Sequence, residues 1–116
     1  MKQPTAFFSL KGINKIIRRD YSIYPIKDIL KELNKYSDYE KYRVWAGILK
    51  LSNGNMNRLK KNVIKANNDY RDILAYSEYP EYSDKIGFDD DKFTRKELNE
   101  IIKRDKRQLD IWRKRK

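Results

Sequence analysis

The chain has 116 residues, of which 39% are hydrophobic, 28 are Lys or Arg and 17 are Asp or Glu, and its formal net charge is +11. It contains no histidine and no cysteine, which excludes disulfides, thiolate or imidazole metal ligands and every catalytic arrangement that depends on a His base. This length fits one domain with one modest core, which we expect to span residues 1–116.

Apolar residues recur at helical spacing along most of the chain. We therefore expect an all-α protein, a compact single-domain bundle of four to six helices with no substantial β-sheet. Pro4 falls in the opening turn of a first helix, and Pro25 suits the first position of a second helix, because its fixed φ matches a helix start. The expected apolar face of the first helix consists of Phe7, Leu10, Ile13 or Ile16, and Ile17.

Capping patterns mark the starts of later helices. Ser37–Glu40 and Thr94–Glu97 each predict a capping box. The hydroxyl of the first residue can accept from the backbone N–H of the glutamate, and the glutamate carboxylate can accept from the backbone N–H of the first residue. Between them, Ser52–Asn55 predicts the end of one helix in a left-handed Asn-Gly pair and the start of the next, which Asn55 caps.

Helix-breaking residues and a run of acidic residues divide the second half of the chain. We expect the helix that follows Asn55 either to continue through Asn68-Asp69 or to end and restart there. In both cases it should end before Pro80, because a proline pushes the preceding residue out of the helical region. Residues 81–93 read as an irregular acidic connection to the last helix. Residues 113–116 are expected to form a frayed basic tail.

The segment DYRDILAYSEYPEY, residues 69–82, concentrates four tyrosines in a lysine-rich chain. On a helix, Tyr70, Ile73 and Ser77 share one face, which favours a structural role in which the helix packs against its neighbour. The alternative is a protein-binding patch, because exposed tyrosines are common at interface hot spots. The candidate residues of that patch are Asp72, Tyr76, Tyr79 and Tyr82.

The run RVWAGILKLSNGNMNRLKKNVIKANNDYRDILAYSEYPEY, residues 43–82, resembles a pattern found in small uncharacterised bacterial proteins. In that pattern a helix ending in Leu-x-Leu-x-x-Gly is followed by a second helix, an Asp-Tyr-Arg-Asp segment and a Glu-Tyr-Pro exit. The resemblance implies a helical domain, and it assigns neither a catalytic residue nor a function.

One loop offers a catalytic hypothesis. Asp89–Asp91 followed by Lys92 could hold Mg²⁺ and stabilise a phosphoryl charge, as in a metal-dependent nuclease. Adjacent acids converge poorly on one ion, however, so a solvated loop before the last helix is the preferred interpretation. The chain also lacks a phosphate-cradling glycine motif. We therefore expect a non-enzymatic protein with no cofactor and no metal site.

Positive charge concentrates at the carboxyl end, where residues 103–116 hold eight bases and two acids. An amphipathic helix of this kind can lie along a phosphate backbone or an anionic membrane, or it can simply be a solvated face. The expected nucleic-acid-binding cations are Lys103, Arg104, Lys106, Arg107, Arg113, Lys114, Arg115 and Lys116.

A second candidate for nucleic-acid binding is the helix after Asn55, which carries Arg58 and Lys61. The short turn Ser52–Asn55 allows a helix-turn-helix arrangement in which this helix reads DNA. The same kind of turn also joins helices in bundles that do not bind DNA.

These observations predict a non-enzymatic interaction module that binds DNA or RNA through its basic carboxyl-terminal helix. The alternative is a small bacterial inhibitor of the immunity or antitoxin type, which uses residues 69–91 and whose partner could be an acidic protein. No apolar run is long enough to cross a bilayer and the amino end is a poor signal peptide, so we expect a cytoplasmic protein.

Overall fold

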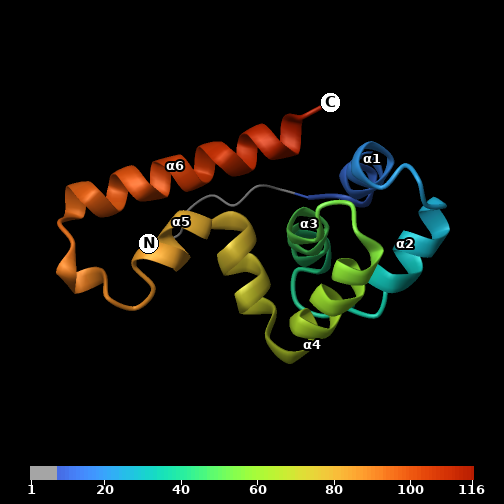
Figure 1. Cartoon of the computed structure of the whole chain (residues 1–116), viewed down its shortest axis with the longest axis horizontal. Helices are drawn as coiled ribbons and strands as arrows, with labels where there is room; N and C mark the ends of the chain where they lie inside the picture. The colour runs from blue at the N-terminus through green and yellow to red at the C-terminus, as the bar shows by residue number, and fades with distance from the viewer. Residues whose placement is uncertain (1–7) are drawn as a thin grey trace.

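The computed structural model describes residues 8–116, which form six α-helices and one short 3₁₀ helix (Figure 1). In chain order these are α1 (Leu10–Asp20), α2 (Ile26–Leu33), α3 (Lys41–Ser52), α4 (Met56–Glu78), α5 (Pro80–Lys85), the 3₁₀ helix η1 (Asp90–Lys92) and α6 (Arg95–Lys114). No strand occurs in the described part of the chain, and the expectation of an all-α bundle is confirmed.

Helix α3 is the centre of the core. Residues 44–49 are all buried, so this helix is apolar on every side rather than on one face. Figure 1 shows α3 nearly end-on, surrounded by α1, α2 and α4. Trp45, at 2% exposure, donates from its indole nitrogen to the carbonyl oxygen of Tyr36 at 2.8 Å. Helices α1 and α4 pack on α3, α2 packs on α1 and α4, and together these four helices form the main body of the protein.

Helix α1 begins at Leu10, later than the opening turn at Pro4 that the sequence predicts. The hydroxyl of Ser9 accepts from the N–H of Gly12 and caps α1, whose buried residues are Ile13, Ile16 and Ile17. Leu10 was expected to face inward, but it is 44% exposed, because it lies at the open first turn.

The structure tests the predicted position of Pro25, but not those of Pro4 and Phe7. Pro25 is the N-cap residue, and α2 begins one position later, at Ile26. Pro4 and Phe7 lie outside the described residues.

The capping box predicted at Ser37 is wrong. Glu40 adopts a left-handed φ of 44° immediately before α3, and its carboxylate pairs with Arg43 instead of reaching back to Ser37. The segment before α3 is held by tertiary hydrogen bonds, since the hydroxyl of Tyr36 also donates to the carbonyl oxygen of Tyr39 at 2.8 Å. These buried contacts override a capping pattern that is worth about 1 kcal/mol.

The turn between α3 and α4 is confirmed. Asn53 and Gly54 both have positive φ angles, 48° and 79°, and the side chain of Asn55 accepts from the N–H of Arg58 at 3.0 Å. Gly54 is required here, because an added Cβ would lie 2.8 Å from the carbonyl oxygen of Asp20.

Of the two alternatives that the sequence leaves open for α4, the structure shows the interrupted helix. Asp69 is extended, with φ −160° and ψ 99°, and its carboxylate accepts from the N–H of Arg71 at 3.0 Å, which starts the second half of the helix. Figure 1 shows the two halves of α4 running in different directions, the first half below α3 and the second half to its left. Ile73 and Ser77 in the second half are buried, as the helical face predicted.

Residues 81–93 are more regular than expected. They contain most of α5 and all of η1, and the irregular part is confined to short connections. At residue 94 the second predicted capping box is present, with Thr94 and Glu97 bonded to each other's backbone N–H. Helix α6 then continues through Lys114, so it includes the first two residues of the expected tail 113–116.

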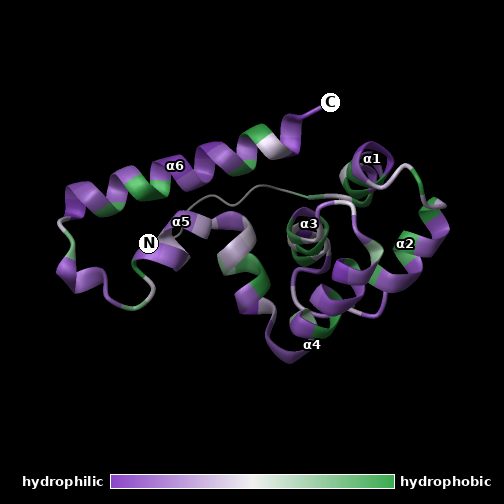
Figure 2. Ribbon diagram, viewed as in Figure 1, coloured by the Kyte–Doolittle hydropathy of each residue, from purple (hydrophilic) through white to green (hydrophobic). Residues whose placement is uncertain are grey.

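Helix α6 packs on α4 and α5 and flanks the body of the protein along one side (Figure 1). Figure 2 shows it as mostly hydrophilic with a few apolar positions. Among residues 8–116, no helix combines the length and the apolar character needed to cross a bilayer.

Candidate functional site

Helix α6 buries one narrow stripe and leaves the rest of its surface open. Its buried residues are Ile101, Asp105, Leu109 and Trp112. Because they recur at intervals of three or four, they lie on one side of the helix. The other side is exposed to solvent along 20 residues, about 30 Å at the usual helical rise.

Four cations share the open side of α6 and lie within about 100° of arc around the helix. They are Lys103, Lys106, Arg107 and Lys114, and all four are exposed. None of the four forms an ion pair with another residue in the range 8–116. Together with Asp110 and Ile111 they line a shallow depression along the helix. We call these four residues the α6 stripe.

Arg104 belongs to the predicted set but is engaged within the fold. Its guanidinium donates to both carboxylate oxygens of Glu81, at 2.8 and 2.6 Å. These bonds, with a further one from Lys85, lower the pKa of Glu81 to about 2. Arg104 therefore ties α6 to α5, and its charge is partly neutralised.

The last cations lie at the end of α6. Arg113 is 3.9 Å from Asp110 and is partly buried, whereas Arg115 and Lys116 are exposed and follow the helix. Of the eight predicted cations, Arg104 and Arg113 alone are paired with described carboxylates.

Arg19 holds the carboxyl end of α6 against α1. Its guanidinium donates to the carbonyl oxygens of Trp112 and Arg115, at 2.7 and 2.8 Å, and to the carboxylate of Asp20. It also lies over the Trp112 ring, 5.1 Å from the centroid. The last carbonyls of a helix have no partner within the helix, so Arg19 acts as a cap supplied by another element.

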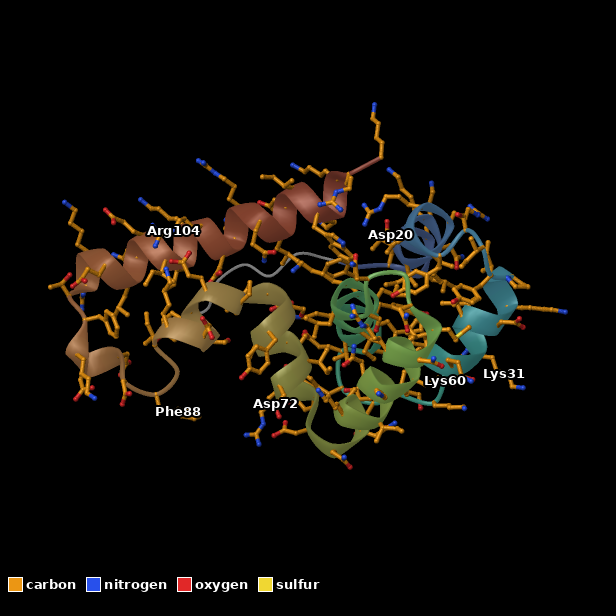
Figure 3. All side chains as sticks on the ribbon, in the orientation of Figure 1. Asp20, Lys31, Lys60, Asp72, Phe88 and Arg104 are labelled. Carbon is orange, nitrogen blue, oxygen red and sulfur yellow. The ribbon has the colours of Figure 1, made fainter. Side chains whose placement is uncertain are left out.

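The second predicted basic set lies elsewhere. Arg58 and Lys61 are exposed on the first half of α4, near Lys60 and Lys65. Figure 3 shows Lys60 and Arg104 well apart, on opposite sides of the molecule. The structure therefore does not bring the cations of α4 together with the α6 stripe. The side chain of Asn55, at the start of this helix, is used as its cap.

The four predicted protein-binding residues do come together. Asp72, Tyr76, Tyr79 and Tyr82 all line one groove of about 460 Å³, which Phe88 and Ile102 complete. Figure 3 places Asp72 on the second half of α4 and Phe88 on the loop after α5. We call this site the aromatic groove. Phe88 is fully exposed, and Tyr76 is 53% exposed.

The acidic loop forms no cation cage. Asp90 and Asp91 lie in η1, and Asp89 is 3.8 Å from Lys92. Within residues 8–116 no three acids lie close enough together to hold a metal ion.

Sequence reasoning missed two residues that shape these sites. Asp105 is 1% exposed in the middle of a basic run, and its carboxylate accepts from the N–H groups of Glu81 and Tyr82 at 2.9 and 3.0 Å. The available signal was its spacing, four residues from both Ile101 and Leu109. Phe88 was passed over as part of an acidic loop, although it is the one aromatic residue between Tyr82 and Phe93.

No protein-family model, curated protein or solved structure matches the chain. Its function is therefore inferred from its own residues and their geometry.

Proposed function

We propose that the protein binds nucleic acid through the outer face of α6, with little preference for sequence. The observation that carries this proposal is the α6 stripe, four exposed cations on one helix face without a carboxylate partner among the described residues. Neutralising phosphates with such cations releases condensed counterions, which drives binding regardless of sequence.

The spacing of the stripe suits a phosphate backbone. Lys103 and Lys114 are separated by about 16 Å along the helix axis, roughly the rise of five nucleotides in one strand. Asp110 lies between them and weakens the field locally, but Arg113 is 3.9 Å away and offsets part of its charge.

The side-chain amide of Gln108 is not free to read bases. Gln108 has the amide that could contact a base, but it donates to the carbonyl oxygens of Ser77 and Glu78, at 3.3 and 3.4 Å. Lys and Arg contacts to phosphate position a protein without specifying sequence. We therefore expect similar affinity for unrelated sequences of the same strandedness.

An anionic membrane is a weaker candidate for the same face. A helix that lies in a membrane interface inserts its apolar side into the lipid. The apolar side of α6, with Leu109 and Trp112, is buried against the protein itself. Ile111 is the one large apolar residue that α6 exposes strongly, at 59%.

A salt titration of binding tests the proposal. Fluorescence anisotropy would be recorded with labelled single-stranded DNA, duplex DNA and RNA of unrelated sequences. The expected result is an affinity that falls steeply with salt concentration and differs little between sequences. The absence of binding even at low salt would contradict the proposal.

Two matched triple variants locate the surface. The first variant replaces three lysines of the α6 stripe by Gln: Lys103, Lys106 and Lys114. The second replaces three lysines that are exposed on α1 and α2: Lys15, Lys27 and Lys31. Both lose the same charge. The first should reduce the slope of log affinity against log salt by up to about 3, since each phosphate contact contributes about 0.9 on duplex DNA. Equal losses in the two variants would contradict a site on α6.

A further inference from the structure

The aromatic groove exposes apolar surface that the fold leaves uncovered. Phe88 is fully exposed, Tyr76 is 53% exposed, and both line the groove together with Ile102 of α6. Large aromatic side chains with an uncovered face typically mark a contact site for a partner. The groove therefore needs an occupant with an apolar side chain.

The charge around the groove indicates the charge of that occupant. Asp72 lines the groove, Asp84 follows the lining residue Ser83, and Asp90 and Asp91 follow Phe88 closely. None of these four carboxylates forms an ion pair with a residue in the range 8–116. A phosphate backbone would be repelled here, whereas a cationic helix would be attracted.

The chain itself carries a surface of this kind. Ile111 is 59% exposed and lies in the depression formed by the α6 stripe, so it is an apolar anchor surrounded by cations. Ile64, on α4, is 62% exposed and is flanked by Lys60, Lys61 and Lys65. The carboxyl half of α6 is the more basic surface, because residues 103–116 hold eight bases and two acids.

The groove and Ile111 cannot meet within one molecule. Ile102 forms part of the groove wall, and Ile111 follows it by nine residues in the same helix. Nine residues at 100° each place Ile111 about half a turn away from Ile102 and about 13 Å further along α6. The two surfaces therefore face in opposite directions.

We propose that the aromatic groove of one copy receives the outer face of α6 from a second copy, with Ile111 as the anchor against Phe88. The contact is heterologous, because a different surface is used on each copy. Since the two surfaces face opposite ways, each copy can still bind a further one, and association is open rather than limited to a dimer.

Analytical ultracentrifugation in the absence of nucleic acid tests this assembly. At low salt the weight-average mass should rise with concentration past that of a dimer, and raising the salt should lower it. Phe88→Lys removes the apolar wall and repels the stripe, whereas Ile111→Asp removes the anchor. Each variant alone should remain monomeric, with a circular dichroism spectrum and thermal unfolding like those of the wild-type chain, because both residues are exposed.

Mixing the two variants gives the sharpest outcome. The F88K chain keeps its α6 face and the I111D chain keeps its groove, so an equimolar mixture should form 1:1 pairs and stop there. Ile64→Asp is the matched control and should associate as the wild-type chain does.

The proposal is overturned by a wild-type chain that stays monomeric at low salt, by a mixture that does not pair, or by loss of association in I64D instead of I111D. It is independent of nucleic-acid binding, because no nucleic acid is present and the F88K chain keeps the whole stripe. A failure here therefore leaves the proposed function standing.

Discussion

The carboxylate of Asp105, on α6, accepts a hydrogen bond from the backbone N–H of Tyr82, on α5, at 3.0 Å. Its other oxygen accepts from the N–H of Glu81 at 2.9 Å. Helix α5 has only six residues and no side-chain cap of its own. Asp105 therefore caps α5 from a helix that begins ten residues after α5 ends, and it joins two of the three helices that line the aromatic groove.

Replacing Asp105 by Ala should lower the free energy of unfolding by about 2–3 kcal/mol, since two buried backbone N–H groups lose a charged acceptor. Asp105→Asn keeps an acceptor oxygen and should lose less. Urea denaturation measures both values. A loss in D105A of less than about 0.5 kcal/mol, as at an ordinary surface position, would show that α5 does not depend on this cap.

Arg19 is expected to hold the last turn of α6 in place. Arg19→Ala removes hydrogen bonds to the carbonyl oxygens of Trp112 and Arg115, and the chain should lose about 1–2 kcal/mol of stability. Hydrogen exchange of the amides of residues 110–114 measures the local effect and should become faster. Arg19→Lys keeps the charge but not the planar fork, so it should restore little protection. Unchanged exchange in R19A would contradict the capping role.

The close contact between α3 and α4 depends on Gly47. A Cβ at this position would lie 2.7 Å from Ser77 Oγ and 2.9 Å from Ile73 Cγ2, so Gly47→Ala should cost about 1–3 kcal/mol through overpacking. The control is Gly12→Ala on α1, where the nearest atom, Ser9 Oγ, is 3.5 Å away. That change should stabilise the chain by up to about 1 kcal/mol, as expected for Ala in a helix. Thermal unfolding that ranks the two variants in the opposite order would refute the packing argument.

Alkaline unfolding should depend on Tyr21. Its side chain is 1% exposed and donates to the carbonyl oxygen of Leu49 at 2.8 Å. Burial raises the pKa of Tyr21 from 10.0 to about 12, so the unfolded chain loses this proton at a lower pH than the folded chain. The resulting stability is complete below pH 10 and is lost as the pH rises toward 12.

Urea midpoints measured across that pH range provide the test. Tyr21→Phe lowers stability at neutral pH, because the hydrogen bond is lost, but it should make the alkaline decline less steep. Tyr36, whose pKa burial also raises to about 12, accounts for part of the decline that remains. An equally steep decline in Y21F and the wild-type chain would contradict the assignment.

Sequence reasoning succeeded where the determinants of structure are local. The left-handed turn at Asn53-Gly54 and the Thr94 capping box each depend on residues within four positions of each other. It failed for α5, which is capped by Asp105 of α6, and for the capping box at Ser37, because hydrogen bonds of Tyr36 and Trp45 fix the chain before α3. A local sequence pattern does not show these tertiary contacts.

The candidate sites follow the same division. Helical periodicity placed the α6 stripe on an exposed face, and it brought Tyr76 and Tyr79 to one surface. It could not show that Arg104 is engaged by Glu81 or that Phe88 completes the aromatic groove, because these contacts join residues from different elements.

Amide chemical-shift mapping would locate the nucleic-acid-binding surface, which we propose to be the outer face of α6. A short single-stranded oligonucleotide is titrated at low salt into the isotope-labelled F88K chain, which keeps the α6 stripe and should not self-associate. The shifts should be concentrated at Lys103, Lys106, Arg107 and Lys114, with little change around the aromatic groove. Shifts concentrated at residues 57–65 of α4, or no shifts at all, would contradict this proposal.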